Sequence, residues 1–408
     1  MPGTINPTMK IERLYLYPIK SIRGIELSST TVTKYGFAND RCFMVLKPTL
    51  ADDGSTVYNN TAIAADNEMC RFFPAFDSPD DRTFFTVTFK PLDNSPDKTI
   101  SIPLEPETDD LRLVDVLMHK SPTRAFLMPD DINAWFTSCF GYDVVLAYIG
   151  THTRDCRMTS TSYKAHEPKP TTATSWLSTA ASIITGSDAA TADDQVSVLK
   201  FTDVAPYLIV SSKSMDDVHS RLPSTEKDTF DITKFRPNLV VSGAEEPWDE
   251  DYWAELSITP SNTSSPASNP DPVKIECEHN CGRCRSINID YATGAQGTGE
   301  AGKMLKKLSS DRRVDKGTKW SPIFGRYSFL HPRSEGREVR VGDAVEVSRR
   351  NGGHTAFGEL EAFYFMSSFM RVLLVVFGFE DESRGCADVG SLLADWNGLS
   401  TLPGLGKD

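Results

Sequence analysis

Short apolar runs separated by turn residues open the chain, and this pattern constrains the fold most because it is typical of β-strands. Residues 25–27 and 41–46 are the clearest runs, and Gly36 marks a turn between them. Near residue 130 the apolar period changes to that of a helix, which is expected to end at Gly141. The first part of the chain is therefore predicted to be a mixed unit with more strand than helix.

A second strand-rich unit begins near Leu199. Residues 207–210 and 239–241 predict buried strands, and Ser214 is expected to cap a helix that follows the first of them. Alternating valines on both sides of Gly342 predict a hairpin. This unit is therefore expected to be a small barrel with helices at its edges.

The chain has 408 residues, which is long enough for two or three domains. Two segments rich in Ser, Thr and Pro, 151–196 and 261–272, are interpreted as surface insertions without a catalytic role. The predicted organisation is a first domain over 9–150, a second over 197–350 and a tail over 351–408.

The formal net charge of −13 argues against a nucleic-acid partner, which would require a basic surface. The N-terminus has no apolar run long enough for a signal peptide or an anchor. The apolar stretch at 363–379 is interrupted by two serines and an arginine, so it falls short of a membrane span. We therefore expect an intracellular protein whose cysteines are thiols.

Three of the eight cysteines, Cys277, Cys281 and Cys284, lie within eight residues. Their CxxxCxxC spacing matches that of a four-iron cluster in radical enzymes, and with His279 they also offer four donors of the kind that zinc takes. Three ordinary thiols and a surface histidine are the simpler interpretation. No GxxxxGK[ST] phosphate-binding loop, GxSxG or HExxH motif competes with this segment, which is therefore the best candidate for chemistry.

Three stretches of the sequence together resemble the MOSC family. YPIKSIRGIELSSTTVTKYGFANDRCFMVL is similar to the β-barrel domain that precedes MOSC, and DVAPYLIVSSKSMDDVHSRL, KFRPNLVVSG and PWDE follow in the family's order. The third stretch runs from CGRC through DYATG to SPIFGRY and VGDAV. The resemblance covers most of residues 9–350. It implies an α+β, β-rich fold, in which an N-terminal β-barrel-like domain precedes a MOSC β-barrel with peripheral helices.

The family includes the amidoxime-reducing components and the C-terminal domain of molybdenum cofactor sulfurases. The resemblance thus implies a bound Mo-molybdopterin, with Cys284 as the catalytic residue and the thiolate ligand of the metal. A soft, anionic thiolate suits a metal that already has dithiolene ligands. Cys281 belongs to the family pattern without a ligand role, and Cys277 departs from it. The family's cofactor-binding positions correspond here to Lys20, Ser21, Arg41, Asp203, Val204, Arg236, Gly282 and Tyr327, with Gly282 standing where relatives have a serine.

By resemblance, the function is reduction of N-hydroxylated compounds such as amidoximes, or of nitrite, in the cytoplasm or in association with mitochondria. The sequence has no flavin, haem or iron–sulfur signature, so electrons are expected from a cytochrome b5 with its NADH-dependent flavin reductase. A basic docking patch for that partner is expected at Lys303, Lys306, Lys307, Arg312 and Arg313.

The alternative is a sulfur-handling module that receives the cofactor as a substrate, and a non-enzymatic cofactor carrier is a third option. The sulfurases carry a pyridoxal phosphate domain ahead of their MOSC region. Only eight residues precede the first expected strand here, which favours the reductase.

Overall fold

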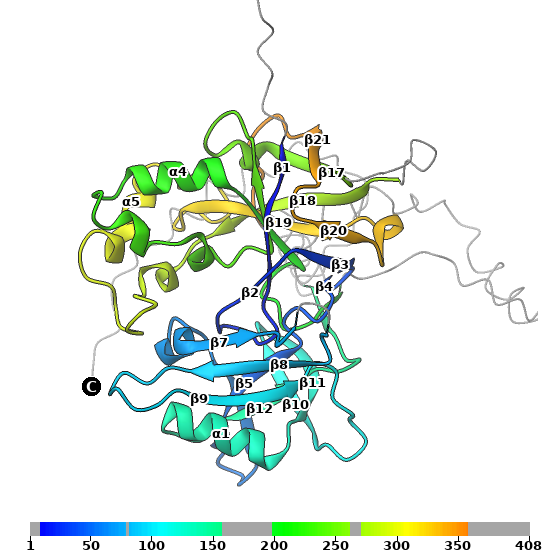
Figure 1. Ribbon diagram of the computed structural model, residues 1–408, viewed down its shortest axis with the longest axis vertical. Coiled ribbons are helices and arrows are strands. Elements are labelled where there is room, and N and C mark those ends of the chain that lie inside the picture. The colour runs from blue at the N-terminus through cyan, green and yellow to red at the C-terminus, as the bar shows by residue number, and fades with distance from the viewer. Residues whose placement is uncertain (1–8, 79–80, 157–197, 262–270, 358–408) are drawn as a thin grey trace, which may run out of the picture. The chain divides into compact units, whose positions relative to one another are not determined.

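The structure, a computed structural model, describes residues 9–78, 81–156, 198–261 and 271–357 (Figure 1). Its strands form two arrangements, one a closed seven-stranded barrel and the other a nearly closed barrel, so the predicted α+β, β-rich class is confirmed. No helix in these ranges is long and apolar enough to cross a membrane. Several predicted features lie outside the described residues, namely most of the two insertions, the apolar stretch 363–379 and Cys386.

Seven described strands close the barrel that carries the cysteine segment, and its β1 comes from the start of the chain. Strands β15 and β16 are parallel, and the other neighbours in the ring are antiparallel. Trp253, Leu256 and Ile275 lie in its core. In order around the ring, the strands are β16 (Leu239–Ser242), β15 (Tyr207–Ser211), β19 (Ile323–Leu330), β18 (Val273–Gly282), β17 (Trp253–Thr259), β21 (Ala344–Arg350) and β1 (Lys10–Leu16), with β2 (Ile25–Leu27) paired to the outer edge of β1.

The nearly closed barrel is built from a five-stranded and a three-stranded sheet that share one apolar core. Helix α1 (Asp130–Phe140) packs Phe136 and Phe140 against Phe72, with ring centroids 5.7 and 4.9 Å apart. The helix ends at Gly141, whose φ of 79° gives a left-handed cap, as the sequence predicts. The strands are β10 (Leu113–Met118), β11 (Ser121–Leu127), β12 (Val145–Tyr148), β5 (Phe43–Leu50) and β6 (Thr56–Asn60) in one sheet, and β7 (Phe72–Ala75), β8 (Phe84–Phe89) and β9 (Lys98–Pro103) in the other.

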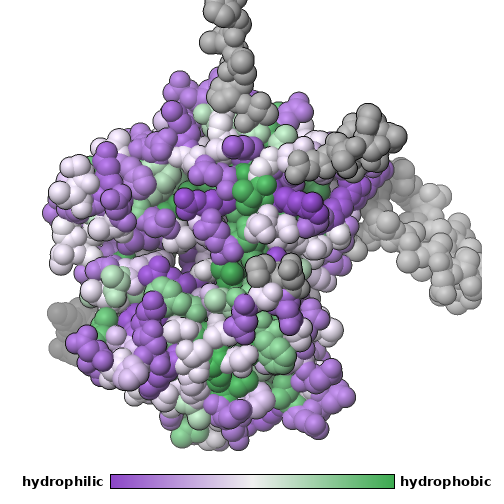
Figure 2. All heavy atoms as spheres, in the orientation of Figure 1, coloured by the Kyte–Doolittle hydropathy of each residue, from purple (hydrophilic) through white to green (hydrophobic). Residues whose placement is uncertain are grey.

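Smaller elements complete the described part of the chain. Hydrophilic residues predominate on the face shown in Figure 2, where the apolar residues gather in small groups. Besides α1, the described α-helices are α4 (Ser212–Ser220) and α5 (Met304–Leu308). The remaining strands are β3 (Ser29–Thr33), β4 (Gly36–Phe37) and β20 (Glu338–Arg340) in one sheet, and the pair β13 (Arg154–Asp155) and β14 (Val198–Leu199).

Two local predictions are wrong. The valines around Gly342 do not form a hairpin, because β20 pairs with β3 whereas β21 pairs with β17 and β1. Helix α4 is capped by Ser211, whose Oγ accepts a hydrogen bond from the Lys213 amide at 3.2 Å. Ser214 lies inside the first turn of that helix and is buried.

Candidate functional site

A cavity of about 140 Å³ lies beside the cysteine segment, where loops from distant parts of the sequence meet. A larger hollow of about 1060 Å³ lies on the nearly closed N-terminal barrel, but its lining includes no cysteine, histidine or lysine. The smaller cavity therefore offers more chemistry. It is lined by every residue of the predicted site: Lys20, Ser21, Arg41, Asp203, Val204, Arg236, Gly282, Cys284 and Tyr327.

Cys284 is the exposed thiol among the described cysteines. It directly precedes the 3₁₀ turn η5 (Arg285–Asn288) as its N-cap residue, and its Sγ lies 3.2 Å from the Ser286 Oγ. Cys277 and Cys281 are buried, and burial raises the pKa of both thiols, that of Cys277 to about 11. Cys281 also lines the cavity, but its thiol is buried with a raised pKa, so the exposed Cys284 is the better soft ligand of the two.

The alternatives of an iron–sulfur or zinc site within this segment are not supported. In the described ranges, no three His, Cys, Asp or Glu side chains lie close enough together to hold a metal ion. His279, predicted to be a surface residue, is buried, and its ring lies 5.7 Å from that of Phe357. The prediction failed because β18 is covered at this point by the segment that follows β21.

Lys20 and Asp203 form an ion pair at the cavity wall. Lys20 is buried, and desolvation lowers the pKa of its ammonium despite the neighbouring carboxylate. Desolvation opposes ionisation of Asp203, but Lys20 and His119 hold its pKa well below the usual range. The His119 Nε2 lies 3.0 Å from the same carboxylate oxygen. Asp203 is therefore ionised and engaged at neutral pH, and it orients Lys20.

Arg41 and Arg236 both stack on the ring of Tyr17, with guanidinium carbons 4.6 and 4.4 Å from its centroid. Arg41 pairs with the buried Asp40 and donates to the Asn238 Oδ1 at 3.1 Å. Arg236 donates through Nη1 to a backbone carbonyl, whereas its Nη2 is buried without a hydrogen-bond partner among the described residues. An unpartnered guanidinium nitrogen beside the cavity is suited to an anionic ligand.

Backbone strain is concentrated at the same residues. Ser21, Arg41 and Arg236 adopt φ values of 68°, 49° and 57°, in the left-handed region that side chains other than glycine rarely occupy. Each such residue costs on the order of 1 kcal/mol, which surrounding contacts must offset, and such residues cluster at functional sites. No sequence signal predicted this strain.

Two further cations line the cavity and were missed from the sequence. Lys234 is buried and donates to the Ile289 carbonyl, and burial lowers its pKa to about 8. Arg283 is buried between the two cysteines of CGRC and donates to the carbonyls of Phe235 and Phe324 at 2.8 and 2.9 Å. Neither forms an ion pair with a described residue. Buried charges of this kind are identified only when the tertiary contacts are known.

Gly282 and Tyr327, on the paired strands β18 and β19, both line the cavity. A Cβ added to Gly282 would lie 3.2 Å from that of Ser321, so Ser321 fills part of the space that a larger residue would need. The Tyr327 hydroxyl interacts with the Cys281 thiol, and burial raises the pKa of Tyr327 well above its usual value. Gly282 thus lies within the cysteine segment, and Tyr327 contacts that segment through Cys281.

The predicted basic docking patch is wrong at Arg312, which is buried and pairs with Asp251 at 2.6 Å. Lys303 and Lys307 both form ion pairs with Glu300, at 2.9 and 2.7 Å, so this one carboxylate offsets one of their two positive charges. The segment around α5 therefore presents less positive charge than its sequence suggests.

The site combines one exposed thiol with five cations, two of which, Lys20 and Arg41, form ion pairs with acids. Arg236 adds a buried, unpartnered donor. These residues fit an anionic, phosphate-bearing cofactor whose metal requires one thiolate.

Comparison with known proteins gives two family matches along the chain. The MOSC N-terminal beta barrel domain matches residues 8–143, and the MOSC domain matches residues 196–346. These ranges contain all nine predicted site residues.

Similar curated proteins fall into two groups. Mitochondrial amidoxime-reducing component 1 of Homo sapiens is 32% identical over 36% of this chain and 38% of its own length. The protein of the same name from Mus musculus is 24% identical over 82% of this chain and 81% of its own. Molybdenum cofactor sulfurase of Oryza sativa subsp. japonica is 24% identical over 83% of this chain but only 35% of its own.

Proposed function

The chain is a MOSC-domain protein with a MOSC N-terminal beta barrel domain, and from this we propose that it binds molybdopterin-bound molybdenum and reduces N-hydroxylated compounds. The observation that carries the proposal is the meeting of the exposed Cys284 with five cations in one cavity. The amidoxime-reducing relatives supply the substrate class.

Each part of the cavity has a distinct role in this proposal. Cys284 provides the thiolate ligand, and Ser286 Oγ at 3.2 Å helps to orient its sulfur. Arg236 and Arg41 bind the phosphate of the cofactor through forked N–H donors, and Tyr17 fixes both guanidinium planes. Lys20 adds a point charge whose position Asp203 sets. When bound, the cofactor supplies oxygen-atom transfer coupled to a two-electron change.

In this proposal the electrons come from a separate donor. Among the described residues, no group of three His, Cys, Asp or Glu side chains could hold a metal ion that would supply them. We place a cytochrome b5-type donor with its NADH-dependent flavin reductase in that role. We also place the protein in mitochondria, the compartment named for two of its relatives. Reconstitution with the two donor proteins and cell fractionation test these two parts.

The function is tested first by measuring molybdenum and pterin in the purified full chain. Benzamidoxime reduction is then measured with chemically reduced methyl viologen, so that no protein donor is needed. We expect stoichiometric molybdenum and pterin, and activity that Cys284→Ser abolishes because a hydroxyl is a poor ligand for a soft site.

Cys277→Ser is the matched control, because this buried thiol lies in the same strand segment and outside the cavity lining. It is expected to retain activity within about twofold. Iron or zinc in place of molybdenum would contradict the proposal, as would full activity in Cys284→Ser. Cofactor binding without reductase activity, together with transfer of sulfur to the cofactor, would support the sulfurase-like alternative.

A further inference from the structure

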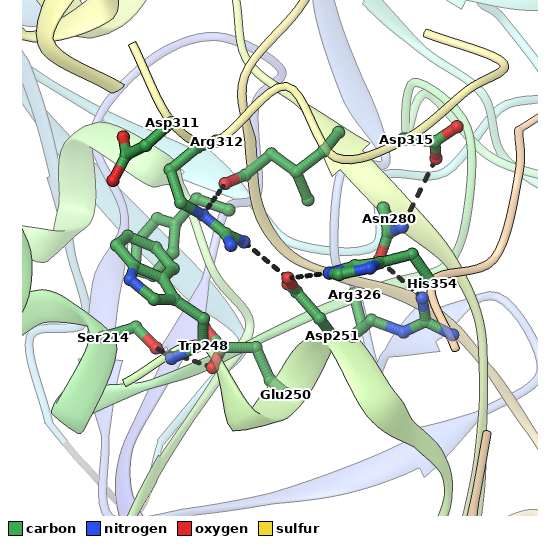
Figure 3. Close-up of polar contacts among 12 residues, drawn as sticks. Ser214, Trp248, Glu250, Asp251, Asn280, Asp311, Arg312, Asp315, Arg326 and His354 are labelled. Carbon is green, nitrogen blue, oxygen red and sulfur yellow. Dashed lines mark hydrogen bonds and ion pairs between the residues drawn. The ribbon is translucent and has the colours of Figure 1, made fainter. Parts of the chain in front are cut away.

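A buried polar network joins the residues that follow the last barrel strand to the two strands that flank the site (Figure 3). Arg326, on β19, is fully buried. Its Nη1 donates to the Asn280 Oδ1 at 2.6 Å and to the Thr355 Oγ1 at 2.7 Å. Its Nη2 donates to the carbonyls of Cys277 and Glu278 at 2.8 and 3.1 Å. Arg326 forms no ion pair with the described acids, so backbone and neutral groups take its hydrogen bonds.

The position of these carbonyls explains why a guanidinium is needed. The pairing of β18 with β19 changes register between Cys277 and His279, and again between Asn280 and Gly282. Such irregularities leave backbone groups without a partner on the neighbouring strand, and buried carbonyls require a donor. Arg326 supplies that donor at the first irregularity. The second lies directly before Arg283 and Cys284, so the two together determine where the cysteine segment leaves the strand.

The segment 351–357, which we call the clasp, closes this network from the outside. The Thr355 carbonyl accepts from the Asn280 Nδ2 at 3.1 Å, and the Phe357 amide donates to the Asp315 carboxylate at 3.0 Å. His354 Nε2 lies 3.1 Å from the Asp251 carboxylate, which also accepts from Arg312. The clasp therefore contacts β18, β19 and the loop that leads to Ser321, which lies against Gly282.

We infer that Arg326 is a positioning residue for Cys284, and that the clasp completes the set of hydrogen bonds that holds the Arg326 guanidinium in place. Arg326 does not line the cavity, and it acts through β18, whose end carries the cysteine segment. The consequence for catalysis rests on the proposed function, because only there is Cys284 a metal ligand. The consequence for the order of β18 does not depend on any cofactor.

The test uses Thr355→Val, which removes the acceptor for Arg326 while keeping the shape of the side chain, and Thr355→Ser, which keeps the hydroxyl. Amide hydrogen exchange is measured on the full chain, produced with and without the molybdenum cofactor. In both forms we expect Thr355→Val to accelerate exchange of the amides in residues 278–284 about tenfold, because a buried donor loses its partner. Amide exchange in the nearly closed N-terminal barrel should stay within twofold of wild type. Thr355→Ser should restore the wild-type pattern.

In the cofactor-loaded protein, Thr355→Val should lower kcat for benzamidoxime more than it changes KM, with Thr355→Ser again restoring the value. Unchanged exchange at residues 278–284 would overturn the inference, as would uniform acceleration in both barrels. Normal kcat in Thr355→Val despite accelerated exchange would overturn the catalytic part. If wild-type protein itself holds no molybdenum, the proposed function fails, while the exchange result still decides whether Arg326 positions the segment.

Discussion

Replacement of Arg236 tests most directly whether the cavity binds the phosphate of a cofactor. The guanidinium uses Nη1 on the Ile22 carbonyl, lies 4.4 Å from the ring centroid of Tyr17, and leaves Nη2 buried and unpartnered among the described residues. A ligand phosphate would provide the missing acceptor. The variants Arg236→Ala and Arg236→Lys then remove, respectively, the whole group and its forked geometry.

The magnitude follows from the number of donors lost. A hydrogen bond to a charged group contributes about 1.5–3 kcal/mol, which corresponds to roughly 10- to 150-fold in affinity. We therefore expect cofactor affinity to fall about 100-fold in Arg236→Ala. Lysine keeps the charge but cannot hold the Ile22 carbonyl and reach a phosphate at the same time, so about tenfold is expected for Arg236→Lys.

Backbone strain does not confound this comparison. Arginine, alanine and lysine all carry a Cβ, so the φ of 57° at position 236 is similarly unfavourable in each. Arg236→Gly removes the backbone strain as well as the guanidinium. It should lose as much cofactor as Arg236→Ala but unfold at a higher denaturant concentration than Arg236→Ala, which separates the two effects.

The assay is the pterin and molybdenum content per chain after purification, followed by the rate of pterin release on dilution. Arg221→Ala is the control, since that arginine is also stacked on an aromatic ring and paired with acids, but lies outside the cavity lining. Wild-type occupancy and release rate in Arg236→Ala would refute the assignment of the phosphate site.

Two further substitutions probe the support of the site and the buried acid next to it. A Cβ on Gly24 would lie 2.6 Å from the Tyr17 ring, so Gly24→Ala should displace the platform of both arginines and lower pterin occupancy, whereas Gly353→Ala, with nothing within 4 Å, should not; equal occupancy in both variants would contradict this. Burial raises the pKa of Glu250 from 4.5 to about 7, despite the Ser214 hydroxyl. The folded protein should therefore lose about 3 kcal/mol of stability as pH rises from about 4.5 to 7, and Glu250→Gln should remove this loss, as urea unfolding at pH 4 and pH 8 would show. A variant that keeps the wild-type pH dependence would disprove the role of Glu250.

Nine residues of the cavity were named from the sequence through short motifs, whereas Lys234 and Arg283, which also line it, were not. Lys20-Ser21 and CGRC belong to short motifs that can be recognised in the sequence without knowing which strands pair. Helix α1 was also predictable, since an apolar period and a following glycine are local signals. Their meeting in one cavity came from the resemblance to a family and not from periodicity.

The errors share one physical origin, which is that alternation identifies a buried face but not the partner that covers it. The valines on both sides of Gly342 do mark two strands, yet each pairs elsewhere. His279 and Arg312 were expected at the surface because histidine and arginine are usually exposed, and both are covered by segments distant in sequence. The left-handed backbone conformation of Arg41 and Arg236 had no signal in the sequence.

The topology makes formation of the site inseparable from closure of the second barrel. Strand β1 completes the ring between β16 and β21, and the chain leaves it directly into Tyr17, Lys20 and Ser21. Without β1, the edges of β16 and β21 would be unpaired, and the cavity would lose the ring that supports Arg236. A MOSC barrel that closes only with the N-terminal strand thus places Lys20 at the cavity and Tyr17 beneath the two arginines in the same step.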